Sequence, residues 1–328
     1  MLTGTVVVYP VALYWRQMRE GGRMPKQTFS VTFWGVRGGY PKPGPTTNKF
    51  GGNTTCIEVH AGDHLVIVDA GTGIIGLGEK LVAQHKTDNE PIVATIIFTH
   101  THHDHTQGFP FFTPLHLGSS IMYIFGPRLL HQDLEAVLEH AMLPPVFPIR
   151  LDELSSMRVI RNISNNEMIV LSDPGTPPQV CNAFREREEC SPSGVKIRTM
   201  RGYAHPGGGV FHYCIEMDDR RVVIATDTEG YIGGDKRLIQ FSREADLLIH
   251  DAEFTSEEYI HGIPSKQGWG HSSWEMAVEV AEAAGAKRLA LTHHNALHDD
   301  AFLENVERQA QALFPAAVVV YEGLTLNL

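Results

Sequence analysis

The chain has 328 residues, and its 42% of hydrophobic residues suffice for a globular protein with a substantial core. Acidic residues outnumber basic residues by 38 to 27, which gives a formal net charge of −11. Such a balance does not favour nonspecific binding to polyphosphate backbones, and it argues against a general nucleic-acid-binding protein.

The N-terminal segment is apolar over Val6–Trp15, but no basic region precedes it and it is too short to span a membrane. We therefore expect no membrane association. We expect residues 1–28 to be an extension that is either disordered or precedes a native start at Met24. Residues 29–328 are then expected to form a single domain.

Four cysteines occur, and they form no C-x-x-C pair and no pattern typical of a disulfide framework: Cys56, Cys181, Cys190 and Cys214. We therefore expect reduced thiols and a cytoplasmic protein.

Apolar and β-branched runs predict ten strands, near 30–36, 55–60, 64–69, 92–98, 121–125, 211–216, 221–226, 246–250, 288–292 and 317–321. Helical spacing predicts four helices, near 75–86, 128–141, 273–284 and 300–313. For the third helix, Ser272-x-x-Glu275 is a candidate capping box and Gly285 a candidate stop. Strands and helices alternate in both halves, which suggests two facing sheets with helices outside. Prolines punctuate residues 140–200, and we expect this insertion to shape a substrate entrance.

The most informative segment is His100-x-His102-x-Asp104-His105, which directly follows the strand predicted at 92–98. Imidazole nitrogens and carboxylate oxygens are ligands that zinc accepts, with manganese and iron as alternatives. Four such side chains in six residues therefore predict a metal site. His103 is expected to face away from this cluster.

Two metal ions would need more donors than this segment offers, including a bridging ligand. Further donors follow other predicted strands or extended segments. These are His205, Asp227 and His293, with His294 as the alternative to His293.

These motifs, in this order, resemble the metallo-β-lactamase superfamily and its ribonuclease Z-like and cyclic phosphodiesterase-like branch. The resemblance runs from about Val31 to Leu328. It implies an α/β fold, a four-layer αββα sandwich, with two divalent metal ions. By position, one ion would be held by His100, His102 and His205. The other would be held by Asp104, His105 and His293, and Asp227 would bridge both.

Two further segments extend the resemblance. Asp69-Ala-Gly-Thr-Gly73 resembles a turn beneath the metal loop, so Asp69 would orient a ligand histidine or a loop amide; an ordinary acidic turn is the alternative. His271 matches a histidine thought to protonate the leaving oxygen, and an exposed histidine at a helix start is the alternative. Asp251, its partner, stands where the family has Glu, and its arm is shorter.

A glycine-rich loop after the first strand offers candidate phosphate or rim contacts, with ordinary loop polarity as the alternative reading: Arg37, Lys42 and Asn53.

The resemblance implies hydrolysis of a phosphodiester by a metal-bound hydroxide, with Asp104 taking the water proton or orienting the nucleophile. Ribonuclease Z grips tRNA with a basic arm, yet residues 128–200 hold eight Arg and Lys against ten Asp and Glu. A small phosphodiester such as a cyclic nucleotide therefore ranks first as substrate. A tRNA 3′-processing endoribonuclease ranks second, and a non-catalytic metal-binding or signalling module is the alternative of another class. A homodimer is left open.

Overall fold

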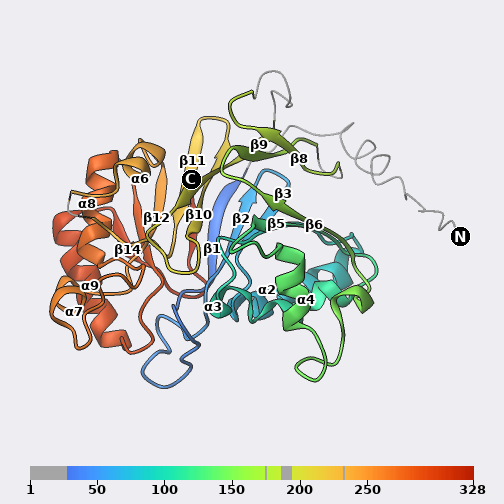
Figure 1. Ribbon diagram of the computed structural model, residues 1–328, viewed down its shortest axis with the longest axis horizontal. Coiled ribbons are helices and arrows are strands. Elements are labelled where there is room, and N and C mark those ends of the chain that lie inside the picture. Colours follow the sequence, from blue (N-terminus) through green and yellow to red (C-terminus); the bar gives the residue numbers. More distant parts are fainter. Residues whose placement is uncertain (1–27, 174–175, 186–193, 232) are drawn as a thin grey trace, which may run out of the picture.

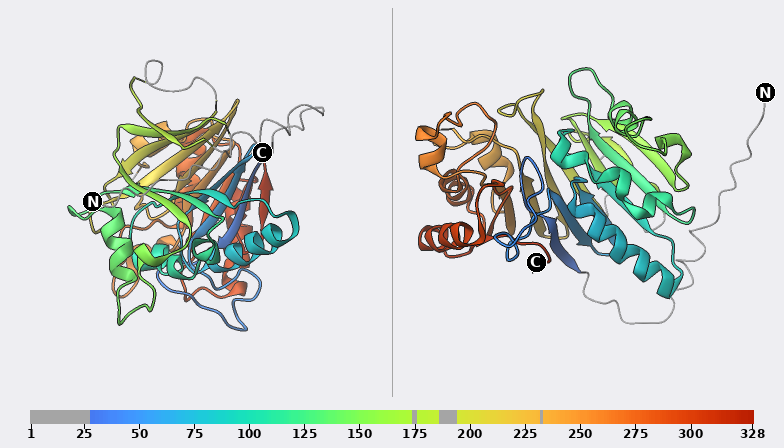
Figure 2. Two further views of the ribbon diagram at one scale, coloured as in Figure 1. Left: turned by 90° about the vertical axis from the view of Figure 1, so that its right-hand side faces the viewer. Right: turned by 90° about the horizontal axis from the view of Figure 1, so that it is seen from below.

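Two β-sheets face each other in the computed structural model, which describes residues 28–173, 176–185, 194–231 and 233–328. Helices cover both outer faces of this pair of sheets (Figures 1 and 2). The predicted α/β, four-layer αββα sandwich is confirmed. Of the predicted N-terminal extension, only Thr28 lies within the described residues.

The first sheet has seven strands in the order β15-β1-β2-β3-β4-β5-β6. Neighbouring strands from β3 to β6 run parallel, so their C-terminal ends meet at one edge of the sheet. Their bounds are β1 Phe29–Gly35, β2 Cys56–Ala61, β3 His64–Val68, β4 Val93–Ile97, β5 Ile121–Pro127, β6 Met157–Ile163 and β15 Thr325–Asn327.

The second sheet has eight strands in the order β14-β13-β12-β11-β10-β9-β7-β8. Neighbouring strands from β11 to β14 are parallel, whereas β7 to β10 pair antiparallel. Their bounds are β7 Glu167–Leu171, β8 Gln179–Asn182, β9 Val195–Gly202, β10 Val210–Met217, β11 Arg220–Ala225, β12 Leu247–Asp251, β13 Leu289–Thr292 and β14 Ala317–Val319.

The helices fall into two groups, one on each outer face (Figure 2). The first sheet is covered by α2 Gly73–Asp88 and α4 Leu134–Ala141, and the second by α6 Lys236–Phe241, α7 Ser256–His261, α8 Trp274–Ala284 and α9 Asp300–Leu313. The short helix α3 spans His103–Thr106. The helix predicted over 128–141 begins only at Leu134, because Leu130 and His131 adopt positive φ angles that a helix does not allow.

Three hydrophobic cores separate the four layers, and strand β3 shows how the sequence builds them. Val66 and Val68 point into the core between the sheets, whereas Ile67 points into the core beneath α2. Because both faces of such a strand are buried, its sequence is a continuous apolar run rather than an alternating one. This is why the central strands were predicted well.

The region from β6 to β9 contains four strands that the sequence did not predict. β6 and β8 lie at sheet edges, where polar and charged side chains are common. In β6, Met157, Val159 and Arg161 face outward, so the apolar run expected of a buried strand is missing. The region therefore extends both sheets; its role in shaping an entrance stays a prediction.

The capping box predicted for α8 is wrong, because the helix begins one residue later and is capped by a single side chain. Ser273 is the N-cap, and its side chain accepts a hydrogen bond from the Met276 amide at 3.3 Å. Ser272 is engaged elsewhere, since its hydroxyl donates to the Thr228 carbonyl. Gly285 ends the helix with a φ of 65°, as predicted.

Cys181 is disulfide-bonded, so the expectation that every thiol is reduced is wrong for this residue. Cysteine spacing alone does not reveal a cross-link, because only proximity of the folded chain permits one. Cys56 and Cys214 are free and buried. Within the described residues, no helix is long and apolar enough to cross a membrane.

Glu58 is a buried carboxylate on β2 that generates a prediction about acid stability. Burial raises its pKa, but hydrogen bonds from His60, Trp34 and Lys80 outweigh this and lower the pKa to about 2. The stabilisation is therefore present above the ordinary pKa of 4.5 and is lost as the pH falls toward 2.

We expect Glu58→Gln to remove this dependence. Between pH 6 and pH 3, the free energy of unfolding measured with urea should fall on the order of 1–3 kcal/mol further for the wild type than for the variant. This range includes a reduction for solvent screening, because Lys80 and His60 are partly exposed. Equal losses in the two proteins would show that Glu58 carries no such charge stabilisation.

Candidate active site

The candidate site lies where the ends of strands from both sheets meet. The segment after β4 supplies four of the predicted ligands, and the segments after β9, β11 and β13 supply the others. Strand ends hold the backbone firmly while leaving side chains free to converge. All seven predicted ligands are brought together, in two adjoining clusters: His100, His102 and His205, and Asp104, His105, Asp227 and His293.

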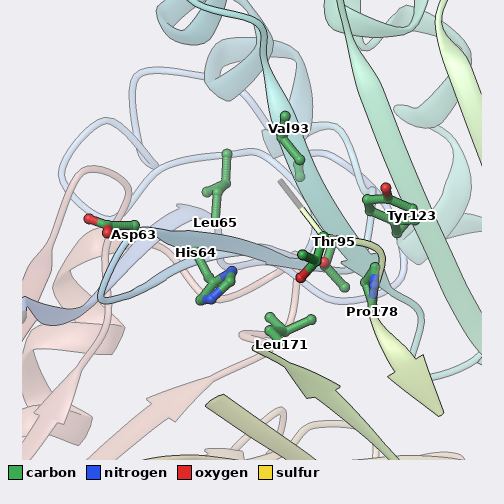
Figure 3. Close-up of a pocket in the computed structure, with 10 residues that line it drawn as sticks. Asp63, His64, Leu65, Val93, Thr95, Tyr123, Leu171 and Pro178 are labelled. Carbon is green, nitrogen blue, oxygen red and sulfur yellow. The ribbon is translucent and has the colours of Figure 1, made fainter. Parts of the chain in front are cut away.

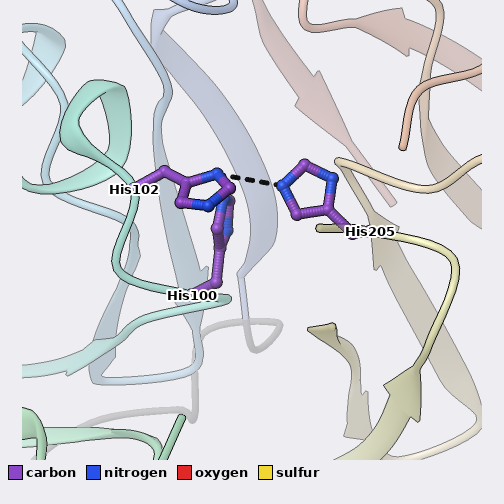
Figure 4. Close-up of side chains that lie close together, drawn as sticks. All are labelled: His100, His102 and His205. Atoms are coloured by element: carbon purple, nitrogen blue, oxygen red, sulfur yellow. Dashed lines mark hydrogen bonds between the residues drawn. The ribbon is translucent and has the colours of Figure 1, made fainter. Parts of the chain in front are cut away.

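In the first cluster, His100 and His102 face His205 across the gap between the sheets (Figure 4). The His205 Nδ1–H donates to the Gly270 carbonyl at 3.0 Å, which leaves a lone pair on Nε2 when the ring is neutral. That Nε2 lies 3.0 Å from His102 Nδ1. The buried His100 Nε2 has no hydrogen-bond partner within the described residues. A divalent cation needs nitrogen lone pairs that converge on one point, and these three rings provide them.

The second cluster is wholly buried and contains two carboxylates. The His105 Nδ1–H points to Asp69 at 2.8 Å, so its Nε2 faces His293 Nε2 at 3.3 Å. Asp104 Oδ2 lies 3.3 Å from both of these Nε2 atoms. Without a shared proton or cation, these lone pairs would repel one another.

Asp227 lies between the two clusters. Its Oδ2 is 3.2 Å from His105 Nε2, and its Oδ1 is 3.2 Å from His293 Nε2. The same Oδ1 is 3.8 Å from His100 Nε2 in the other cluster. The side chain of Thr226 donates to Oδ2 at 2.6 Å and fixes the carboxylate. This position fits a bridging ligand.

The electrostatics of the clusters favour a cation. Burial lowers the pKa of His100, His102 and His205, so these rings are neutral donors of lone pairs. Burial also opposes charge on His105 and His293, yet Asp227 foremost raises both of their pKa values well above normal. A bound metal would replace the protons that those two rings otherwise hold.

Three site residues adopt left-handed backbone conformations that non-glycine residues rarely accept. Their φ angles are 61° at Asp69, 55° at Asp227 and 60° at His293. Such strain persists only where surrounding contacts hold it, and it is common at functional sites. Here it turns a side chain at each strand end toward the centre.

Asp69 lies beneath the clusters with no exposed surface. Besides His105, it accepts hydrogen bonds from the Thr99 amide and hydroxyl, both at 2.8 Å. It therefore contacts both of the partners expected for it, a histidine of the cluster and a loop amide. Gly38 packs against the other side of the site, where a β-carbon would lie 2.3 Å from the His293 ring.

His271 lies beside the clusters with two carboxylates behind it. Its Nδ1 is 2.8 Å from Asp251 Oδ2 and 3.2 Å from Glu253 Oε2. Burial lowers the pKa of His271, but these carboxylates outweigh it and raise the pKa to about 9. The shorter arm of Asp251 thus still reaches the histidine. His271 also stacks on His293, with ring centroids 4.9 Å apart.

Glu229 is a site residue that the sequence analysis missed. Its carboxylate accepts hydrogen bonds from the amides of Gly268 and Gly270 at 2.6 and 2.9 Å, and from the Tyr259 hydroxyl at 2.6 Å. It thereby ties the segment after Asp227 to the loop that leads into His271. The only indication in the sequence that Glu229 belongs to the site is its position two residues after Asp227.

Several other candidates lie elsewhere. The prediction that Arg37 contacts substrate is wrong, because its side chain is fully buried and donates to three backbone carbonyls, those of Gly51, Asn295 and His298. Asn53 donates to Glu322 at 3.0 Å, and Lys42 is exposed.

His294, the alternative to His293 as a ligand, and His103, which was expected to face away, both lie outside the clusters. The His294 ring donates to the Val320 carbonyl, and His103 is exposed.

A separate small cavity lies between the sheets near the starts of β3 and β4, away from the strand ends that carry the clusters (Figure 3). Its lining includes His64, Tyr123 and Leu171. None of the clustered His and Asp residues lines it, so the chemistry is assigned to the strand-end site.

A four-layer αββα sandwich with adjoining His and Asp clusters at its strand ends defines a class of metal-dependent hydrolases. A sequence model described as the beta-lactamase superfamily domain matches residues 64–294, more than half of the chain. The chain therefore belongs to the metallo-β-lactamase superfamily.

Two curated relatives cover nearly the whole chain. A protein named Ribonuclease BN from Cronobacter sakazakii is 24% identical in an alignment of 332 positions that covers 91% of this chain and 99% of the relative. A protein named Ribonuclease Z from Halobacterium salinarum is 27% identical over 321 residues, covering 91% and 97%.

Solved structures support the fold. The metallo-beta-lactamase fold protein YhfI from Bacillus subtilis superposes with a TM-score of 0.63 at 19% identity, covering 92% of this chain and 100% of that one. A diphosphatase from the PhnP family superposes with a TM-score of 0.59 at 16% identity, covering 92% and 98%.

The clusters predict two bound divalent ions per chain. His102→Ala should lower the metal content measured by mass spectrometry, because it removes a donor nitrogen that faces His205 across the first cluster. His103→Ala is the matched control, since His103 is adjacent and equally exposed but belongs to neither cluster. Full metal content in His102→Ala, or equal loss in both variants, would contradict this assignment.

Proposed function

We propose that this protein is a binuclear metal-dependent phosphodiesterase, with zinc as the first candidate metal and manganese or iron as alternatives. One ion would be held by His100, His102 and His205, and the other by Asp104, His105 and His293, with Asp227 shared. Two bound ions lower the pKa of a water molecule and stabilise negative charge on a phosphoryl group. Residues 29–328 would act as one hydrolase domain.

The observation that carries this proposal is His271, held by Asp251 and Glu253 beside the clusters. Cleavage of a phosphodiester releases an alkoxide, which leaves readily only if it receives a proton. A histidine whose pKa is raised to about 9 keeps that proton at neutral pH. We therefore assign His271 as the general acid and Asp251 as the residue that orients it.

Asp104 would orient the nucleophile. Its Oδ2 accepts a hydrogen bond from the Gly39 amide at 2.8 Å. Although burial raises its pKa, His105 and His293 hold that pKa well below its usual range. A carboxylate of such low basicity is a poor proton acceptor, so positioning is the role that its environment supports.

The relatives favour RNA as the substrate class. The relatives from Cronobacter sakazakii and Halobacterium salinarum are named ribonucleases, which supports the tRNA 3′-processing endoribonuclease over the small phosphodiester that ranks first from charge alone. A small phosphodiester is the second candidate. The observations that favour it are the acidic balance of residues 128–200 and the structural likeness to a diphosphatase.

The acid is tested by leaving-group dependence. His271→Ala should lose about 10²–10⁴-fold in kcat on a substrate with a poor leaving group, and much less on bis(p-nitrophenyl) phosphate, whose leaving group needs little protonation. Metal content is measured alongside, because His271 adjoins the clusters. Equal losses on both substrates would indicate a structural role.

The pH profile gives a second test of the same residue. An acid must be protonated, so kcat/KM should fall as the pH rises through the pKa of His271. Asp251→Asn removes a carboxylate that raises this pKa, and the alkaline limb should therefore move to lower pH. An unmoved limb, with metal content retained, would contradict the assigned acid.

The substrate class is tested by parallel assays of precursor tRNA, cyclic nucleotides and bis(p-nitrophenyl) phosphate with added zinc or manganese. We expect cleavage of precursor tRNA on the 3′ side of the acceptor stem. Efficient hydrolysis of cyclic nucleotides with intact precursor tRNA would instead establish the small-substrate candidate.

A further inference from the structure

Two exposed aromatic side chains flank the candidate site, and the chemistry described above does not use them. Tyr203 is 65% exposed and Trp269 is 47% exposed. Large aromatic side chains are costly to leave in water, so a pair of them beside one site calls for an explanation.

The loops that carry these two rings touch each other at the site. Tyr203 lies two residues before His205, and Trp269 immediately precedes Gly270, whose carbonyl accepts the His205 hydrogen bond at 3.0 Å. Because successive Cα atoms are about 3.8 Å apart, the Tyr203 Cα lies within about 8 Å of the His205 Cα, and the Trp269 Cα lies about 3.8 Å from the Gly270 Cα. The loops that carry both rings therefore border the first cluster.

Basic side chains accompany both rings. The guanidinium carbons of Arg201 and Arg237 lie 5.4 and 5.5 Å from the centre of the Tyr203 ring. The Lys266 ammonium lies 3.8 Å from the centre of the Trp269 ring. Three basic side chains thus accompany the two rings, with the Glu229 carboxylate beside the Trp269 loop, although the chain as a whole carries a formal net charge of −11.

Both loops are held in place by hydrogen bonds. Arg201 donates to the Gly208 carbonyl and closes the loop that contains Tyr203 and His205. Glu229 accepts from the amides on either side of Trp269. Because these loops are already fixed, ordering them on ligand binding costs little entropy. The free energy of stacking on the rings can then contribute to affinity.

We propose that Tyr203 and Trp269 form a stacking rim for unpaired nucleotides adjoining the scissile phosphodiester, with Arg201, Arg237 and Lys266 facing the phosphates. Aromatic rings interleaved with basic side chains are the means by which proteins bind single-stranded nucleic acid. A cyclic mononucleotide offers the two rings only one base, whereas a single strand offers them successive bases. The proposal rests on the proposed phosphodiesterase function and narrows its substrate to a strand with unpaired nucleotides.

The test measures binding separately from cleavage. Fluorescence anisotropy of the metal-loaded protein is recorded with phosphorothioate decamers that resist hydrolysis, namely single-stranded RNA, single-stranded DNA of the same sequence, and a blunt RNA duplex. Tyr203→Ala and Trp269→Ala should each raise the Kd for single strands by about 5- to 150-fold. Tyr203→Phe and Trp269→Tyr keep a ring and should stay within about threefold of the wild type.

Metal content is measured on the same variants and should equal that of the wild type, because neither ring belongs to the clusters. If RNA and DNA single strands both bind, the result supports a rim that stacks on bases. If only the RNA strand binds, the result supports the rim together with a further contact to the 2′-hydroxyl of the sugar.

The proposal is overturned if the wild type binds no single strand, if the alanine variants bind as the wild type does, or if they lose duplex binding equally. If the wild type hydrolyses no phosphodiester at all, the proposed function fails, while the binding data still decide the rim.

Discussion

The buried carboxylate of Asp227 is the constraint on which the rest of the site depends. A charge with 1% exposure is unfavourable by several kcal/mol unless opposite charges and hydrogen bonds surround it. Imidazoles from both clusters supply that environment, and they do so fully only when protonated or when a cation lies between them. The site is therefore incomplete without positive charge. Because Asp227 contacts both clusters, it also fixes how far apart they lie.

The two-sheet architecture makes this convergence possible. Parallel strands in each sheet end at the same edge, and facing the sheets places two such edges side by side. The first sheet contributes the loop after β4, held from below by Asp69, and the second contributes Asp227 and His293. The left-handed backbone at these three aspartate and histidine positions shows that the turns, and not only the side chains, are adapted to the site.

The sequence predicted the central strands and the clusters because their signals are local: continuous apolar runs, and donors directly after them. It did not predict β6 to β9, where sheet edges admit polar residues, nor Glu229, whose partners are amides forty residues away in the chain. Arg37 was misassigned for a similar reason. From sequence, an arginine in a loop is expected to lie at the surface. Only the fold shows that three backbone carbonyls surround its buried guanidinium.

The pair of carboxylates behind His271 has a physical reason in this setting. His271 Nδ1 lies 4.0 Å from Asp227, so ions bound by the clusters would repel a proton on its ring. One carboxylate at the shorter reach of aspartate would compensate only part of that repulsion. Glu253 adds a second negative charge, and its Oε2 also lies 3.4 Å from His293 Nδ1. With ions bound in the clusters, a histidine that stays protonated at this position would need both carboxylates, so the pair formed by Asp251 and Glu253 suits the acid role proposed for His271.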